Sequence, residues 1–441
     1  MRMKTTVMFI GVLMSVILIF SGCSKEEIDN EVGERQEEDN EETGNVTTDA
    51  TDKITEIVFW HHYNEQSNEN KVLTEIIIPE FEKQNKNIKV ETVSHDWADL
   101  HKKMIVATTA NELPDVARLD SAWIPEFEQM GILLSLNNEF SDFEEVKEEI
   151  LEGPMNTAKV KGNYYGLGLN TNTKVLFYNN ELLESNNLPV PKTMEEFFEV
   201  AIKISANSGE QAIWGYGEPG LSGWNVCPLI WSNGGEILNE DYTEVEGYLN
   251  SEKNIALLDR LVELYNIEAM SGFNSGDMPM TDGFAQGRYA MLFDGPWKYA
   301  ELRGGHPDFK SYRTTTMPEG DGGSIQVLGG EDISITQTAN KEASWEFVKF
   351  MTSEFAQVEM GKVGQIPVNI QAMSNEEIKN IEDFSIFIEA LKTAKARPTI
   401  AEWPQIDTMI TDAFTSALLG AKTPEDALNE ATMEIEKIIK K

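Results

Sequence analysis

The chain has 441 residues, which is more than one hydrophobic core normally supports, so two domains of ordinary size are expected. Hydrophobic residues make up 41% of it, enough to build folded cores, and this excludes a wholly disordered protein. The 75 acidic residues outnumber the 36 basic ones and give a net charge of -39. Because a strongly negative chain repels phosphate backbones, no nucleic acid is expected as a partner.

Residues 1–22 have the pattern of an export signal. Basic residues precede an uncharged run over residues 7–20, which has the length of the hydrophobic part of a signal peptide and is short for a membrane-spanning helix. The run ends in Phe20-Ser-Gly-Cys23, which resembles the lipobox at which bacterial lipoproteins are diacylated on the cysteine and cleaved. A signal peptide, a lipid anchor on Cys23 and a position at the extracytoplasmic face of a bacterial membrane are therefore predicted.

Residues 23–53 are predicted to form a tether between that anchor and the folded part. Twelve acidic residues stand there against three basic ones, with no aromatic residue. Such a segment cannot bury enough apolar surface to fold, and its like charges keep it extended. An acidic tail that binds a metal or a partner is the alternative.

From residue 54 the chain alternates between strand and helix patterns. The predicted elements are, in order, a strand over 54–60, a helix over 71–84, a strand over 88–93, a helix over 100–110, a strand over 114–120 and a helix from Ile124. This order predicts an α/β fold with a mostly parallel sheet and helices on both faces. Its ligand crevice is expected beyond the carboxyl ends of the strands.

A second set of elements follows. We expect a strand over 175–178, a helix from Met194, an aromatic loop over 223–235, and helices over 254–265, 343–351 and 423–439. The last helix begins with the start signal Thr423-Pro-Glu-Asp.

The sequence has no Walker A loop, no His-Glu-x-x-His, no Cys-x-x-Cys and no Gly-x-Ser-x-Gly, and its one literal Gly-x-Gly-x-x-Gly, at 215–220, has Pro219 inside it and no helix pattern directly after it. Two cysteines, Cys23 and Cys227, are too few for a disulfide scaffold, and Cys227 is expected to be a small buried apolar residue. Zinc binding by the early histidines is an alternative, although adjacent histidines on an extended chain point to opposite faces. A carboxylate pair such as Glu331-Asp332 could also serve a glycosidase.

Tryptophans provide the most informative pattern, since several stand in predicted loops beside Asp, Asn, Gly or Pro. They are Trp60, Trp97, Trp123, Trp224, Trp231, Trp297 and Trp403. A sugar ring has an apolar C–H face and a rim of hydroxyl groups, so it is bound well by flat aromatic rings next to carboxylate or amide groups. The pattern therefore favours a carbohydrate site.

The order of short motifs resembles the family 1 extracellular solute-binding proteins, the maltose-binding-like subunits of ABC importers. The motifs are Phe59-Trp-His, Leu113-Pro-Asp-Val, Trp123-Ile-Pro-Glu-Phe with Gly131-Ile-Leu-Leu, Tyr165-Gly-Leu with Asn172-Thr-Lys-Val-Leu-Phe-Tyr-Asn, Trp231-Ser-Asn-Gly-Gly-Glu, Phe284-Ala-Gln-Gly-Arg-Tyr-Ala-Met with Gly295-Pro-Trp, Gly329-Gly-Glu-Asp and Gly364-Gln-Ile-Pro-Val. Each is weak alone, and together they run through nearly the whole mature chain.

This resemblance implies a monomeric, non-enzymatic protein with two α/β lobes and a ligand cleft between them. The ligand would be a sugar or oligosaccharide, with a maltooligosaccharide favoured, and the partners would be ABC permease subunits; no cofactor and no metal are expected. The lobes would interleave in sequence, with lobe 1 formed by residues 54–168 plus 333–366 and lobe 2 by residues 171–328 plus 371–441.

The resemblance also assigns roles to residues. Asp120 and Trp123 would contribute from lobe 1, and Trp231, Trp297 and Trp403 would stack on sugar from lobe 2. The full set of candidate ligand-binding residues adds the predicted loops after the strands and the crossing segments: Trp60, His61, Tyr63, Asn64, Asp96, Trp97, Asn172, Trp224, Glu331 and Asp332. A surface enzyme acting on glycosides, and a protein that binds zinc or a peptide, remain alternatives.

Overall fold

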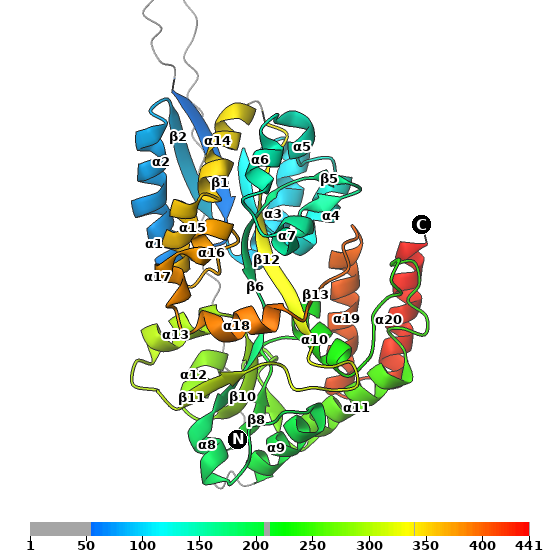
Figure 1. Cartoon of the computed structure of the whole chain (residues 1–441). Helices are drawn as coiled ribbons and strands as arrows, with labels where there is room; N and C mark the ends of the chain where they lie inside the picture. Colours follow the sequence, from blue (N-terminus) through cyan, green and yellow to red (C-terminus); the bar gives the residue numbers. More distant parts are fainter. Residues whose placement is uncertain (1–53, 207–211, 339, 441) are drawn as a thin grey trace, which may run out of the picture. The chain divides into compact units, whose positions relative to one another are not determined.

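Two large β-sheets organise the part of the chain that the computed structural model describes, which is residues 54–206, 212–338 and 340–440 (Figure 1). The predicted signal peptide, Cys23 and the acidic tether lie outside the described residues. Within the described ranges, no helix combines the length and the apolar character that a membrane span requires.

The first sheet has the strand order β13-β12-β3-β1-β2, with β6 also paired to β12. Its strands are β1 (Thr55–His61), β2 (Ile88–Ser94), β3 (Val116–Asp120), β6 (Leu167–Asn172), β12 (Gln326–Ile335) and β13 (Ala394–Ala396). As predicted, β1 runs parallel to both β2 and β3. Strand β12 runs antiparallel to β3 and β6, and its residues come from more than 150 positions later in the chain.

Helices cover the first sheet and supply its core. They include α1 (Asn68–Val72), α2 (Ile78–Gln84), α3 (Trp97–Ala110), α4 (Ile124–Gln129), α14 (Lys341–Met351) and α15 (Glu354–Gly361). The single helix predicted over 71–84 contains one π-helical turn, η1 (Leu73–Ile77), between α1 and α2. The N–H of Ile78 bonds to the carbonyl of Leu73 there, directly before Pro79, which has no N–H to donate.

The second sheet has the order β11-β7-β10-β8-β9. Its strands are β7 (Val175–Asn179), β8 (Trp214–Gly217), β9 (Met270–Ser271), β10 (Tyr289–Asp294) and β11 (Tyr312–Thr315). Helices α9 (Met194–Ala206), α10 (Gly223–Ser232), α11 (Glu252–Asn266), α13 (Trp297–Gly305), α19 (Trp403–Leu418) and α20 (Pro424–Ile439) belong to the same half of Figure 1. Thr423 caps α20 through its side chain, as its start signal predicts. The ranges predicted for the two lobes stay a prediction.

The prediction of an aromatic loop over 223–235 is wrong, because residues 223–232 form helix α10, with Pro228 inside it. Gly, Asn and Pro in this stretch are typical of a loop. The helix forms nevertheless because residues 226–232 are all buried, and this packing outweighs the weak local propensity. Trp97, Trp297 and Trp403 likewise stand at the first positions of helices rather than in loops.

Replacing Gly215 by alanine should destabilise the fold. Gly215 lies in β8, and an added methyl group would come within 2.1 Å of the carbonyl oxygen of Ala201 on α9. Overpacking of this kind costs about 1 to 3 kcal/mol of unfolding free energy, which urea denaturation would measure.

The control is Gly153→Ala in α7 (Glu152–Thr157), where an added methyl group meets nothing within 4 Å. There the substitution should leave stability unchanged or raise it by up to about 1 kcal/mol. Equal effects at Gly215 and Gly153 would contradict the close packing of β8 on α9.

Candidate functional site

A cavity of about 790 Å³ is lined by residues from the first sheet, from segments next to it in sequence, and from helices α10 and α13. One group follows or ends strands of the first sheet: His62, Tyr63, Asn64, Gln66, Ser67, Asn68, Glu69, Trp97, Arg118 and Asp120. A second group comes from β6, β12 and the segments after α15 and β13: Asn172, Gly329, Gly330, Glu331, Val363, Gln365 and Arg397. The third comes from α10 and α13: Ser222, Trp224, Trp297, Ala300, Glu301 and Gly304.

Strand geometry places the polar groups of the first sheet in this cavity. Arg118 and Asp120 are two residues apart on β3, so their side chains leave the same face of the sheet. Glu331 on β12 pairs directly with Asp120 on one side and with Asn170 of β6 on the other. Neighbouring residues in register on adjacent strands share a face, so these groups meet.

Aromatic rings line the cavity from opposite sides. Trp97 at the start of α3 is 45% exposed, and its indole Nε1 donates to Asp120 Oδ2 at 3.2 Å. Trp224 and Trp297, from α10 and α13, have ring centroids 6.1 Å apart and planes inclined by 36°. These rings offer apolar faces next to polar groups, which is the combination that a sugar ring requires.

Two glycines allow Trp224 to reach the cavity. A methyl group on Gly329 would lie 2.4 Å from the Trp224 ring and 2.2 Å from Asn172 Oδ1. One on Gly223 would lie 2.7 Å from the ring of Trp403. Both positions therefore need a residue without a side chain, and Trp403 supports the start of α10 from within the core.

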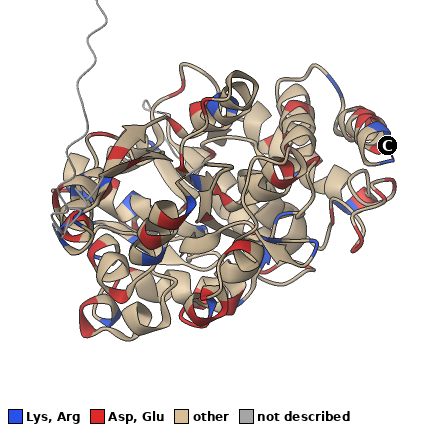
Figure 2. Cartoon of the chain, turned by 90° about the horizontal axis from the view of Figure 1, so that it is seen from above, with Lys and Arg blue, Asp and Glu red and all other residues tan. Residues whose placement is uncertain are grey.

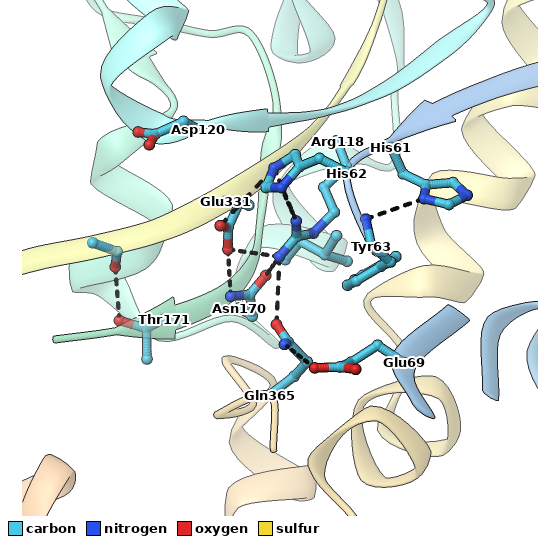
Figure 3. A network of polar contacts seen from close by, with 12 residues as sticks. His61, His62, Tyr63, Glu69, Arg118, Asp120, Asn170, Thr171, Glu331 and Gln365 are labelled. Atoms are coloured by element: carbon cyan, nitrogen blue, oxygen red, sulfur yellow. Dashed lines mark hydrogen bonds and ion pairs between the residues drawn. The ribbon is translucent and has the colours of Figure 1, made fainter. Parts of the chain in front are cut away.

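A buried polar network surrounds Arg118 (Figure 3). Its guanidinium forms an ion pair with Glu331 at 2.9 Å, and Nη1 donates to the ring of His62 at 2.9 Å. The same guanidinium lies 4.2 Å from the centroid of the Tyr63 ring. Asn170 Nδ2 donates to Glu331 Oε2 at 2.5 Å. Burial and the charge of Arg118 hold the pKa of His62 well below its ordinary value, so this ring is neutral and accepts from the arginine.

A second ion pair connects the two aromatic sides of the cavity. Arg397 Nη2 lies 2.7 Å from Asp120 Oδ1, and both side chains are largely buried. The Arg397 guanidinium is 5.7 Å from the ring centroid of Trp224. Asp120 thus holds Trp97 through one oxygen and Arg397 through the other.

Of the residues predicted from the sequence, those that the structure brings to the cavity are Tyr63, Asn64, Trp97, Asp120, Asn172, Trp224, Trp297 and Glu331. Those that do not line it are Trp60, His61, Asp96, Trp123, Trp231, Asp332 and Trp403. The roles of all these residues in ligand binding stay predictions.

Trp231 and Trp403 lie in the core packed around the second sheet, 4% and 1% exposed. Trp231 is near the end of α10 and Trp403 begins α19, and burial of both rings anchors those helices. Both rings therefore belong to the core in this structure, and substitutions there would first affect stability.

Four further predicted residues lie close to cavity-lining residues, in sequence or in space, without lining the cavity themselves. Trp123 is buried, with its ring centroid 5.1 Å from that of Trp97. Asp96 occupies the N-cap position of α3, directly before Trp97. His61 is fully buried between Phe59 and Tyr63, and Trp60 packs on His95.

Several cavity residues were not predicted from the sequence. They are His62, Gln66, Ser67, Asn68, Glu69, Arg118, Ser222, Ala300, Glu301, Gly304, Gly329, Gly330, Val363, Gln365 and Arg397. One signal was available for Arg118, because charged Arg118 and Asp120 alternate with apolar residues in the predicted strand 114–120. Arg397 follows a three-residue strand and carries no comparable pattern.

Comparison with known proteins places the chain in a family. Residues 64–358 match the family model of the bacterial extracellular solute-binding proteins. The chain belongs to this family.

Relatives of this solute-binding protein align over most of their length. A putative binding protein of Brucella abortus is 26% identical over 380 residues, covering 82% of this chain and 88% of the relative. The maltotriose-binding protein of Pyrococcus abyssi is 25% identical, covering 78% and 73%. The GacH receptor of Streptomyces glaucescens, solved unliganded and with acarbose, superposes with a TM-score of 0.77 at 23% identity, covering 87% of this chain and 98% of that one. This likeness confirms the two-lobe α/β fold of the solute-binding proteins.

Asp332, next to Glu331 on β12, faces away from the cavity and has no cation beside it among the described residues. The register of β12 against β6 shifts between these two residues. Burial raises the pKa of Asp332 well above its ordinary value. Thr157 Oγ1 lies 2.6 Å from the carbonyl of Pro154 and 3.0 Å from Asp332 Oδ1, so the protonated carboxyl can donate to the hydroxyl while the hydroxyl donates to the carbonyl.

Asp332→Asn should therefore stabilise the protein at neutral pH. A carboxyl whose pKa is raised by folding contributes stability below its unfolded pKa, near pH 4, and loses it as the pH rises through the folded pKa. The amide resembles the protonated acid at every pH, so we expect a gain of about 1 kcal/mol or more at pH 7 that vanishes near pH 4. Urea denaturation at a series of pH values measures it.

Asp142→Asn is the control of opposite sign. Burial raises the pKa of Asp142, but hydrogen bonds from Lys349 and Trp345 outweigh it and leave the pKa lowered, so the contribution of Asp142 to stability is present at neutral pH and lost in acid. This substitution should destabilise the protein at pH 7. A gain for Asp332→Asn that does not depend on pH would contradict the protonated state.

Proposed function

We propose that this chain is the substrate-binding component of an ABC importer and binds a sugar or oligosaccharide in the cavity. The observation that supports this most directly is the arrangement of Trp97 opposite Trp224 and Trp297, with planar carboxylate, amide and guanidinium groups between them. Aromatic faces bury the apolar side of a sugar ring while the planar groups bind its hydroxyls. The cavity volume of about 790 Å³ is in the range of small-molecule sites.

Binding would act through an equilibrium between open and closed forms. A ligand that contacts α3 on one side and α10 and α13 on the other gains all its contacts only when the two halves approach each other. It therefore shifts the population toward closure, and the closed form is the one that a permease would receive.

The proposed site binds without cleaving. A glycosidase needs one carboxyl that donates a proton and a second that acts as base or nucleophile. Here Glu331 is held by Arg118 and Asn170, and Asp120 is held by Arg397 and the Trp97 indole. Carboxylates fixed by cations and donors are suited to accept hydrogen bonds from sugar hydroxyls.

Maltooligosaccharides are the first ligands to test. Relatives include the maltotriose-binding protein of Pyrococcus abyssi and the maltodextrin-binding protein of Bacillus subtilis. Another relative is a maltooligosaccharide ABC transporter solute-binding lipoprotein of Streptococcus pneumoniae, 25% identical over 294 residues, which agrees with the lipid anchor that we propose at Cys23. We propose that the anchored protein acts as a monomer at the extracytoplasmic face of the membrane.

Titration calorimetry with maltose, maltotriose and longer maltooligosaccharides tests the proposal, with galactooligosaccharides, zinc and a tripeptide in parallel. We expect heat of binding with at least one carbohydrate and none with zinc or peptide. Chromatography of the carbohydrates after overnight incubation should show no new products. Binding of zinc or peptide alone, or cleavage of a carbohydrate, would contradict the proposal.

Removing a cavity ring should weaken binding without unfolding the protein. Trp97→Ala and Trp224→Ala should each reduce the free energy of sugar binding by about 1 to 3 kcal/mol, the usual worth of a stacking aromatic side chain. Calorimetry measures the affinity, and thermal denaturation confirms that each variant is folded.

The matched control is Trp214→Ala on β8, a half-buried tryptophan whose ring centroid lies 5.3 Å from that of Tyr289 and which does not line the cavity. Its affinity should equal that of the unaltered protein. If the affinity survives in both cavity variants, the rings do not stack on the ligand.

A further inference from the structure

Both arginines that line the cavity already have partners from this chain. Arg118 is 4% exposed and paired with Glu331, and Arg397 is 6% exposed and paired with Asp120. A buried cation that is already paired offers little attraction to a second anion, because the first carboxylate offsets its charge. Neither arginine is therefore available to bind an acid group of a ligand.

Two helix starts at the cavity also have a carboxylate beside them. Ser222 and Trp224, at the start of α10, line the cavity, and the N–H of Gly223 donates to Asp407. Helix N-termini attract anions through their free N–H groups and the helix dipole. At α13, which contributes Trp297, Asp294 lies just ahead of the helix and accepts from the N–H of Gly295 at 2.8 Å.

The lining contains two further carboxylates, one from each side of the cavity. They leave the lining with an excess of negative charge. Glu69 on α1 accepts a long hydrogen bond from Gln365 at 3.4 Å, and it has no ion-pair partner in the part of the chain that the structure describes. Glu301 on α13 shares one cation with Asp294, since Lys298 Nζ lies 2.6 Å from Glu301 and 3.0 Å from Asp294. Lys174 also interacts with Asp294, but it lies beside Glu218 as well, so two ammonium groups face three carboxyl groups here.

We infer that the cavity selects uncharged carbohydrates and rejects acidic ones, such as oligosaccharides that carry a uronic acid, with Glu69 and Glu301 as the residues that set this selectivity. The inference rests on the proposed function. An acidic sugar would lose water on entering a wall whose positive groups are all compensated, and it would meet two like charges. Acidic side chains are also frequent on the helices seen around the molecule in Figure 2, in keeping with the net charge of -39, so the wider field has the same sign.

The test compares matched ligands at pH 7 and low ionic strength. The probes are maltotriose, galactobiose and xylotriose, each beside its counterpart in which one sugar is a uronic acid. In every pair that binds, calorimetry should give the acidic member a Kd at least about tenfold higher, equivalent to about 1.4 kcal/mol. Raising the salt concentration to about 0.3 M should bring the two Kd values closer together, because screening weakens the repulsion.

Variants identify the residues responsible. The double variant Glu69→Gln with Glu301→Gln should lower the ratio of the acidic to the neutral Kd by at least about threefold. The Kd of the neutral member should change less. The control variant carries Glu389→Gln and Glu434→Gln, which remove two exposed charges outside the cavity. Each of these carboxylates pairs with a lysine three residues away, as Glu301 does. The control variant has the same net charge as the cavity variant and should keep the full ratio.

The outcomes separate the inference from the proposed function. If an acidic member binds as tightly as its neutral counterpart, or tighter, the selectivity is overturned while carbohydrate binding stands. If the control variant lowers the ratio as much as the cavity variant, the discrimination belongs to the overall charge and not to Glu69 and Glu301. If no carbohydrate binds at all, the proposed function fails and the inference fails with it.

Discussion

The site depends on the pairing of two buried arginines with two carboxylates at the meeting point of β3, β6 and β12. Removing an ion from water costs several kcal/mol, so a buried charge persists only where a partner is fixed beside it. Arg118 with Glu331, and Arg397 with Asp120, satisfy this condition at 2.9 and 2.7 Å. Deleting one member of a pair would leave the other buried and uncompensated. The resulting destabilisation would also reach the aromatic rings that these groups contact.

Those ion pairs also explain how aromatic rings from distant elements come to share one cavity. Asp120 binds the Trp97 indole and the Arg397 guanidinium, and Arg397 in turn lies beside the Trp224 ring. A charged pair therefore connects α3 with α10, the helices that carry Trp97 and Trp224.

The sequence allowed a good prediction of the fold and a partial one of the site. Strands β1, β2 and β3 follow from apolar and β-branched runs, because a short periodic pattern depends only on neighbouring residues. The tryptophans were harder, since a ring beside Gly, Asn or Pro has the same local sequence whether it faces a cavity or the core. Trp224 and Trp231 illustrate this, because both lie on α10 and only the first lines the cavity. Which face of that helix is covered depends on α19 and β12, which pack against it and are remote in sequence.

Glu331 and Asp332 show most directly why the chemistry of a site needs the structure. They are adjacent carboxyl groups on one strand, and both were expected to contact a ligand. Side chains alternate along β12, so Glu331 points to Arg118 and the cavity, and Asp332 to Thr157 and the interior. Burial raises the pKa of both carboxyl groups; for Glu331 the Arg118 cation opposes this effect, whereas no cation opposes it for Asp332. Two acidic residues one position apart therefore have their pKa values raised to different degrees because they point to opposite faces of the strand, and only Glu331 is placed to accept a hydrogen bond from a ligand in the cavity.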